Sequence, residues 1–161
     1  MASFDIRLVM TREAGGRPES EGVISLEDQR ERFVASHEVW SWDDYVSQWA
    51  DAARRLIAGH PACFVTDLAS ASGDREYRGE RWNAWPRGDV IEFQHQLLVG
   101  DDPDFDAHDP CASVSPAPVT TNSDGVTPST WYVPRVEIHS WLERTMAIGS
   151  GGGVSGEGRA E

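Results

Sequence analysis

The sequence predicts an α+β domain, with a mainly antiparallel sheet and two helices, one long and amphipathic over about 41–58 and one C-terminal over about 135–146. Three observations lead to this fold class. Alternating apolar and polar runs on both sides of the first helical segment indicate strands. That segment carries a helical apolar stripe and a cap, and Pro134 stands where a second helix would begin. Because one central helix cannot connect parallel strands throughout, a doubly wound sheet is not expected.

The chain length corresponds to one domain. Its 161 residues can enclose a single sizeable core, and we expect that domain to span 1–147. The remaining segment, 148–161, is rich in glycine and serine and is expected to be a disordered tail.

The N-terminal segment is expected to contribute strands separated by a loop. Residues 4–10 alternate apolar and polar with a period of two, which is typical of a strand. Residues 11–22 are rich in glycine, proline and charge and predict a loop. We then expect a short element near 23–26 and a strand over 32–40.

The segment 41–58 has the clearest local pattern. Ser41 is a favourable N-cap, and Asp44 three residues later completes a capping-box-like pair. Gly59 follows as a residue able to adopt the left-handed conformation that ends helices. An apolar stripe repeats at helical spacing through Tyr45, Val46, Trp49, Ala52, Ala53, Leu56 and Ile57.

Further strands and the closing helix are expected after it. The apolar run 61–70 predicts one strand, and 75–88 and 90–99 predict a pair whose short turn makes them antiparallel. The segment 101–130 holds five of the nine prolines and predicts a long surface loop. A short strand at 131–133 precedes the closing helix.

Composition and charge exclude several classes of function. The formal net charge is −13, and all 14 basic residues are arginine. This balance opposes binding to nucleic acid, which needs a basic surface, and to anionic membranes, whereas basic protein partners would be attracted. No apolar run is long enough to cross a bilayer, and the N-terminus lacks a signal-peptide pattern, so we expect a cytoplasmic location.

The run 101–109 carries five aspartates and no basic residue. Asp102, Asp104 and Asp106 match positions 1, 3 and 5 of a calcium-binding loop, but Ala107 replaces its glycine, and its final glutamate is also missing. A catalytic carboxylate pair needs an apolar pocket that raises one pKa, whereas a proline-containing acidic loop implies solvent. We therefore expect a surface, either solvated or partner-binding, and no metal site.

No catalytic or cofactor-binding motif is found elsewhere. The five histidines show no metal-ligand spacing, and the chain lacks a GxSxG elbow, a CxxC pair and a phosphate-binding loop. Cys63 and Cys111 are too few for a disulfide framework or a zinc site, and Cys63 is expected to be a small core residue. The sequence therefore predicts a binding protein, not an enzyme, with no cofactor.

Trp82 and Trp85 are candidate anchors for a partner. They lie three residues apart, so on a regular strand they point to opposite faces of the sheet. Unless a helix covers its side, one of the two is expected to be exposed. An exposed tryptophan beside an acidic loop is typical of an interface hot spot.

The order of these elements from about Val39 to Leu142 resembles the immunity proteins of bacterial contact-dependent growth inhibition systems. The resemblance rests on "WSWDDYVSQWADAARRLIAG", then the small-residue strand "ACFVTDLAS", then "RWNAWPRGD" turning into "VIEFQHQLLV". A variable loop and Trp131 before the last helix also match. His95 departs from the family, which often has asparagine after the residue corresponding to Gln94.

The resemblance implies a cytoplasmic protein without a catalytic site, which acts as a monomer or in a 1:1 complex by blocking a cognate toxin domain. Many such toxins are nucleases with basic clefts, which an acidic partner can steer toward itself. For partner binding we expect Asp101, Asp102, Asp104 and Asp106, with Trp82 or Trp85 as anchor. The alternative is a solitary small-molecule-binding or hydrolytic domain, whose aromatic-rich sheet would form a pocket near Trp82, Trp85 or Trp131.

Overall fold

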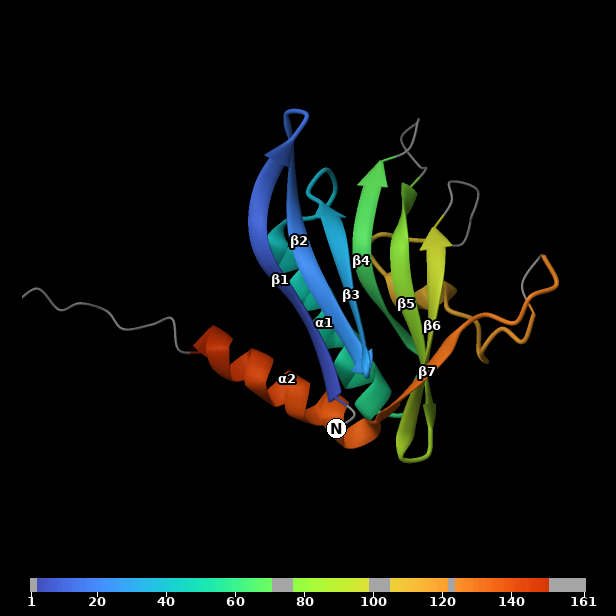
Figure 1. Ribbon diagram of the computed structural model, residues 1–161. Helices are drawn as coiled ribbons and strands as arrows, with labels where there is room; N and C mark the ends of the chain where they lie inside the picture. The colour runs from blue at the N-terminus through green and yellow to red at the C-terminus, as the bar shows by residue number, and fades with distance from the viewer. Residues whose placement is uncertain (1–2, 71–76, 99–104, 122–123, 151–161) are drawn as a thin grey trace, which may run out of the picture.

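The computed structural model describes residues 3–70, 77–98, 105–121 and 124–150 (Figure 1). Along the chain the elements are β1 (Ser3–Ala14), β2 (Arg17–Glu27), β3 (Gln29–Ser36), α1 (Trp42–Ile57), β4 (Ala62–Ser70), β5 (Tyr77–Arg87), β6 (Val90–Leu98), the short 3₁₀ helix η1 (Pro110–Ser113), β7 (Thr130–Pro134) and α2 (Arg135–Ser150). The α+β class predicted from the sequence is confirmed. Neither of these two α-helices is long and apolar enough to span a membrane.

The strands form two antiparallel sheets in the described part of the chain, where a single sheet was expected. One has the order β1-β2-β3 and the other β4-β5-β6-β7. The sheets stand side by side with β3 next to β4, α1 lies behind them, and α2 crosses the lower end (Figure 1). No backbone ladder joins β3 to β4, so each sheet presents an open edge to the other.

The prediction of a loop over 11–22 is wrong, because this segment forms the tip of a long β-hairpin. Ala14 pairs with Arg17, so only Gly15 and Gly16 form the turn. Their φ angles are +60° and +76°, and two consecutive left-handed residues suit a two-residue hairpin turn. The element expected near 23–26 is part of β2, and the strand expected over 32–40 begins and ends earlier, as β3.

The first helix is confirmed almost to the residue. The Ser41 hydroxyl accepts the amide of Asp44, and the Asp44 carboxylate accepts the amide of Ser41, so the capping box is complete. Residues of the predicted stripe, including Tyr45, Trp49 and Leu56, are buried. The stripe therefore fixes which side of α1 faces the sheets.

An aromatic cluster joins the two sheets and α2. The ring of Phe4 in β1 lies 5.3 Å from Phe64 in β4, 5.7 Å from Phe93 in β6 and 5.7 Å from Trp141 in α2. The Trp141 indole N–H also donates to the carbonyl oxygen of Ile6 at 3.2 Å. Aromatic pairs at these separations add to the free energy gained by burying their area. The first strand and the last helix thus share one core.

No described strand pairs with the edge of β4 that faces β3. Side chains of α1 form hydrogen bonds with the backbone groups of that edge instead. Gln48 Nε2 donates to the carbonyl oxygen of Cys63 at 2.6 Å, and Gln48 Oε1 accepts the amide of Val65 at 2.8 Å. The Trp49 indole donates to the Val65 carbonyl oxygen at 2.7 Å. Buried backbone groups need partners, and here a helix supplies them.

The C-terminal part agrees with prediction except in its lengths. Residues 105–121 carry only η1 as regular structure. The helix α2 ends at Ser150, beyond the predicted 146, so it includes the first residues of the segment expected to be a tail; 151–161 lie outside the described residues. Arg135 at its start donates to the carbonyl oxygens of Leu56 and Ile57, at 3.0 and 2.9 Å, and so caps the end of α1.

Candidate functional site

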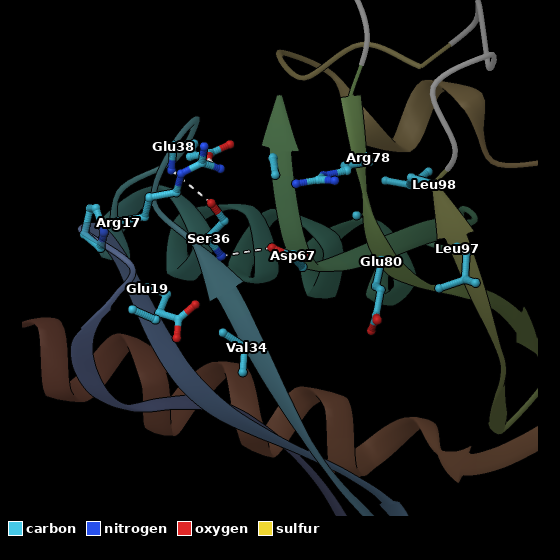
Figure 2. A pocket seen from close by; sticks show the side chains of 14 residues that line it. Arg17, Glu19, Val34, Ser36, Glu38, Asp67, Arg78, Glu80, Leu97 and Leu98 are labelled. Atoms are coloured by element: carbon cyan, nitrogen blue, oxygen red, sulfur yellow. Dashed lines mark hydrogen bonds and ion pairs between the residues drawn. The ribbon is translucent and has the colours of Figure 1, made fainter. Parts of the chain in front are cut away.

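A groove opens where the two sheets diverge. It encloses about 450 Å³ between the ends of β1, β2 and β3 on one side and β4, β5 and β6 on the other. We call it the inter-sheet groove (Figure 2). Its charged lining residues are Arg17, Glu19, Glu38, Asp67, Arg78 and Glu80.

The groove continues along the gap between the sheets into a second hollow of 370 Å³. This hollow shares Val34, Asp67 and Glu80 with the first and adds Glu21 and Arg32. Together the two hollows hold five acidic side chains and three arginines. Their lining therefore carries a net negative charge.

Asp67 occupies the middle of the groove, between Ser36 and Glu80 (Figure 2). Its Oδ1 accepts the backbone amide of Ser36 at 2.9 Å, across the gap from β4 to β3. Burial raises the pKa of the Asp67 carboxyl, the Ser36 amide opposes that rise, and the nearby Glu80 charge adds to it. Asp67 is thus a half-buried carboxylate that a cation would stabilise.

The carboxylates on either side of Asp67 have their own partners. Glu38 pairs with Arg17 at 2.8 Å. Glu80 lies 3.3 Å from His95, and this hydrogen bond lowers the pKa of Glu80 against the opposing effect of burial. These partners are exposed or partly exposed, so water and an incoming charge can compete for the same oxygens.

Gly79 allows β5 to approach β4 at this point. A Cβ built on Gly79 would lie 1.9 Å from the carbonyl oxygen of Asp67, which no side chain can tolerate. The register of β4 also shifts between Val65 and Asp67, opposite β5. A bulge re-aims the side chains that follow it, and this one precedes the carboxylate that lines the groove.

The rim of the groove is apolar. Val34 is 39% exposed and Leu97 is 60% exposed, and both line the inter-sheet groove together with Leu98. Exposed aliphatic side chains around a charged hollow suit a partner whose basic side chains have long apolar stems. The arrangement favours binding to a basic protein surface.

The predicted acidic residues fall mostly outside the described chain. Asp101, Asp102 and Asp104 lie in the segment that is not described. Asp106 is exposed, and its Oδ1 accepts the backbone amide of His108 at 2.8 Å. Asp106 does not line the inter-sheet groove.

The expectation that Trp82 or Trp85 is exposed is wrong, because they are only 2% and 3% exposed. The Trp82 ring packs 5.1 Å from Trp131, and the Trp85 indole donates to the Ser115 carbonyl oxygen at 2.8 Å. The segment around Ser115 therefore covers Trp85, while Trp82 is buried against Trp131. Neither indole is exposed to a partner in this structure.

The pocket alternative gains little support from the described residues. Trp85 does line a 280 Å³ hollow, but the other residues around it are mainly prolines with Gly59, Ala117 and Arg87. A ligand site needs several polar groups that converge on the ligand. This hollow supplies one arginine.

The groove was missed because its acids come from four separate segments. Glu19 belongs to β2, Glu38 follows β3, Asp67 belongs to β4 and Glu80 to β5. No local motif links them. The available signal was Asp67 itself, a charged residue inside the otherwise apolar run "ACFVTDLAS".

Comparison with known proteins adds two findings. A family model described as "CdiI N-terminal domain" matches residues 35–141. The structure is similar to one chain of a solved structure described as the "CdiA-CT/CdiI toxin and immunity complex from Enterobacter cloacae", with a TM-score of 0.68 and 14% identity over 89% of this chain and 99% of that chain. At this identity the likeness shows a shared fold. No curated protein sequence matches the chain.

Proposed function

The chain belongs to the CdiI N-terminal domain family, the immunity proteins of contact-dependent growth inhibition systems, and we propose that it neutralises a cognate toxin domain by binding it at the inter-sheet groove. The observation that carries this proposal is the net acidic lining of the groove beneath an apolar rim. The solved structure that the chain resembles is itself a toxin and immunity complex.

The expected partner is a basic toxin domain, and nucleases are the class that fits best. A nuclease cleft is built to hold phosphates, so the carboxylates of Glu19, Asp67 and Glu80 can take their place. The net charge of −13 steers a basic domain toward this protein from a distance. Binding then blocks substrate entry in a 1:1 complex, inside the cell that makes the immunity protein.

The acidic run 101–106 is proposed as an extension of this surface. It begins three residues after Leu98, which is the last residue of β6 and lines the groove. Within the run, Asp101, Asp102, Asp104 and Asp106 would add carboxylates to the same interface.

The first test is co-expression with the toxin domain encoded next to this gene, scored by growth and by co-purification. Immunity predicts that the chain restores growth and co-purifies with the toxin domain. A neighbour that is not toxic, or a toxin that is neither bound nor neutralised, would contradict the proposed function.

The second test locates the interface. The variant Asp67→Asn/Glu80→Gln removes two groove charges, and Asp51→Asn/Glu143→Gln removes two from exposed positions on α1 and α2. We expect the groove variant to bind the toxin at least tenfold more weakly than the matched control. Equal affinities would keep the function but place the interface elsewhere.

A further inference from the structure

Two thiols lie side by side behind β4. Cys63 belongs to β4 and is fully buried, whereas Cys111 belongs to η1 and is 8% exposed. Both are free, and their Sγ atoms are 3.7 Å apart although the residues are 48 positions apart in the sequence. A disulfide has an S–S bond of about 2.05 Å, so an approach of roughly 1.7 Å would join them.

The two sulfurs have unequal surroundings. Cys111 Sγ accepts the backbone amide of Cys63 at 3.3 Å, and Gln48 Nε2 lies 3.9 Å from it as a second donor. Donors directed at a sulfur favour its thiolate form. The single Cys63 thiol hydrogen has two acceptors within reach, the carbonyl oxygen of Pro110 at 3.4 Å and Cys111 Sγ at 3.7 Å.

The pKa values follow the same asymmetry. Hydrogen bonds from the Cys63 thiol and from the Cys63 backbone amide lower the pKa of Cys111 to about 7 in spite of its burial. The bond to Cys111 and burial both raise the pKa of Cys63. Of the two sulfurs, Cys111 is therefore the one that more readily becomes a thiolate.

Cys111 also has the better access. It lines a 590 Å³ pocket between α1 and residues 107–111, with Arg54 and Arg55 among the other lining residues. A pocket of this size can admit a small molecule. Its charged lining also includes Asp44, Asp51 and Asp109, so the pocket carries both signs of charge. Cys63 does not line this pocket.

We propose that Cys63 and Cys111 form an oxidisable dithiol site that reacts with low-molecular-weight disulfides, such as oxidised glutathione. The Cys111 thiolate attacks one sulfur of the small disulfide, forming a mixed disulfide and expelling one small thiolate. Cys63 then gives up its proton, attacks Cys111 Sγ and expels the second small thiolate. The protein loses two electrons and two protons, and the small disulfide is reduced to two thiols.

The new bond would fasten η1 to β4. Next to Cys111, the Pro110 carbonyl oxygen and the Ser113 hydroxyl accept the buried Arg81 guanidinium at 3.0 and 2.7 Å. A disulfide that fastens η1 would therefore also fix the segment whose oxygens accept hydrogen bonds from Arg81. A bridge between residues so far apart in sequence also restricts the unfolded chain.

The experiment uses the purified, reduced full chain, incubated with oxidised glutathione and analysed by intact mass. We expect the wild type to lose about 2 Da without becoming a dimer or keeping an adduct, and its Tm to rise. Cys63→Ala should stop at one glutathione adduct on Cys111, and Cys111→Ala should not react. Both variants are first shown to be folded by circular dichroism.

The pH dependence of the first attack gives a second readout, which distinguishes this site from a thiol that is only accessible. The first step in the wild type should accelerate with pH through a midpoint near 7, because the thiolate is the nucleophile. In Cys63→Ala the midpoint should lie higher, because the Cys63 thiol that lowers the pKa of Cys111 is gone. A wild type that keeps an adduct or resists oxidation, or a Cys111→Ala variant that reacts as readily as Cys63→Ala, would overturn the proposal. If a variant fails to fold, the wild-type product and the pH dependence of its first step decide.

Discussion

The Gln48 side chain takes the place of a neighbouring strand beside Val65: its Oε1 accepts a hydrogen bond from the Val65 amide at 2.8 Å. The same side chain donates to the Cys63 carbonyl oxygen, so two edge groups of β4 are satisfied from α1. Because these groups already have partners, β4 does not pair with β3. The sheets stay separate, and the groove between them remains available.

Replacing Gln48 with leucine should destabilise the fold strongly. The substitution leaves the Cys63 carbonyl and the Val65 amide buried without partners, which costs about 2–5 kcal/mol of unfolding free energy. Urea denaturation measures this loss. The neighbouring exposed Ser47→Ala variant is the control and should change stability by less than about 0.5 kcal/mol. A Gln48→Leu variant as stable as the control would show that water replaces the amide.

Gly79→Ala should damage both stability and toxin binding. The added methyl group would meet the Asp67 carbonyl oxygen, so β5 must move away from β4 at a cost of about 3 kcal/mol or more. Gly16→Asn is the control, since its left-handed turn position has open space that asparagine tolerates. Thermal unfolding and toxin binding are measured together. An unchanged Tm would mean that the strands separate freely.

Asp67→Asn should stabilise the free protein at neutral pH. Burial raises the folded-state pKa of Asp67 above its unfolded value, so its ionisation opposes folding, and the stability present at low pH is lost as pH rises through the folded pKa. Asparagine keeps an acceptor for the Ser36 amide. The stability advantage of the variant should therefore be present at about pH 7 and vanish by about pH 3.

This pH dependence is tested by measuring the urea unfolding midpoints of wild type and Asp67→Asn between about pH 3 and pH 7. Glu80 behaves oppositely, because its hydrogen bond to His95 lowers its pKa and its contribution is lost as pH falls. Glu80→Gln is therefore the comparison variant. An advantage of Asp67→Asn that grows toward acid would contradict the assignment.

Arg135→Ala should loosen the junction of α1 and α2. The guanidinium donates to two carbonyl oxygens at the end of α1, and its loss should cost about 1.5–3 kcal/mol, the range for hydrogen bonds to charged groups. Exposed Arg144→Ala on the same helix is the matched control. The stability of Arg135→Lys should lie between those of wild type and Arg135→Ala, because an ammonium group cannot reproduce the planar guanidinium geometry. Denaturant titration of the three variants checks the order.

Toxin association should slow steeply with salt. If carboxylates of the groove steer a basic domain, raising ionic strength from about 0.05 M to 0.5 M should lower kon at least tenfold and change koff much less. Stopped-flow mixing measures both rates. A salt-independent kon would mean that the charge on this surface does not guide the encounter.

The sequence predicted those elements whose stability is local. Ser41 and Asp44 form the expected capping box, and the stripe through Trp49 orients α1. The hairpin tip was missed because it extends beyond the core. Its strands have no buried face there, and the contacts of Arg12 with Glu19 and Glu21 occur between strands and leave no periodic pattern.

The candidate site could not be predicted because it depends on the gap between two sheets. A run such as 101–109 is conspicuous in a sequence, whereas Glu19, Asp67 and Glu80 come together only after β2, β4 and β5 are placed. The two tryptophans were misjudged for a related reason. Trp85 is covered by the irregular segment near Ser115. No sequence pattern predicted that this segment packs on the sheet.

The bond between the Trp141 indole and the Ile6 carbonyl joins residues 135 positions apart. Such long-range closure slows folding, because nearly the whole chain must be arranged before the contact forms. On the ribosome, β1 emerges before α2 and must wait for it before their shared core is complete. The strands that line the groove, the last of which is β6, are therefore all synthesised before the core behind them can close.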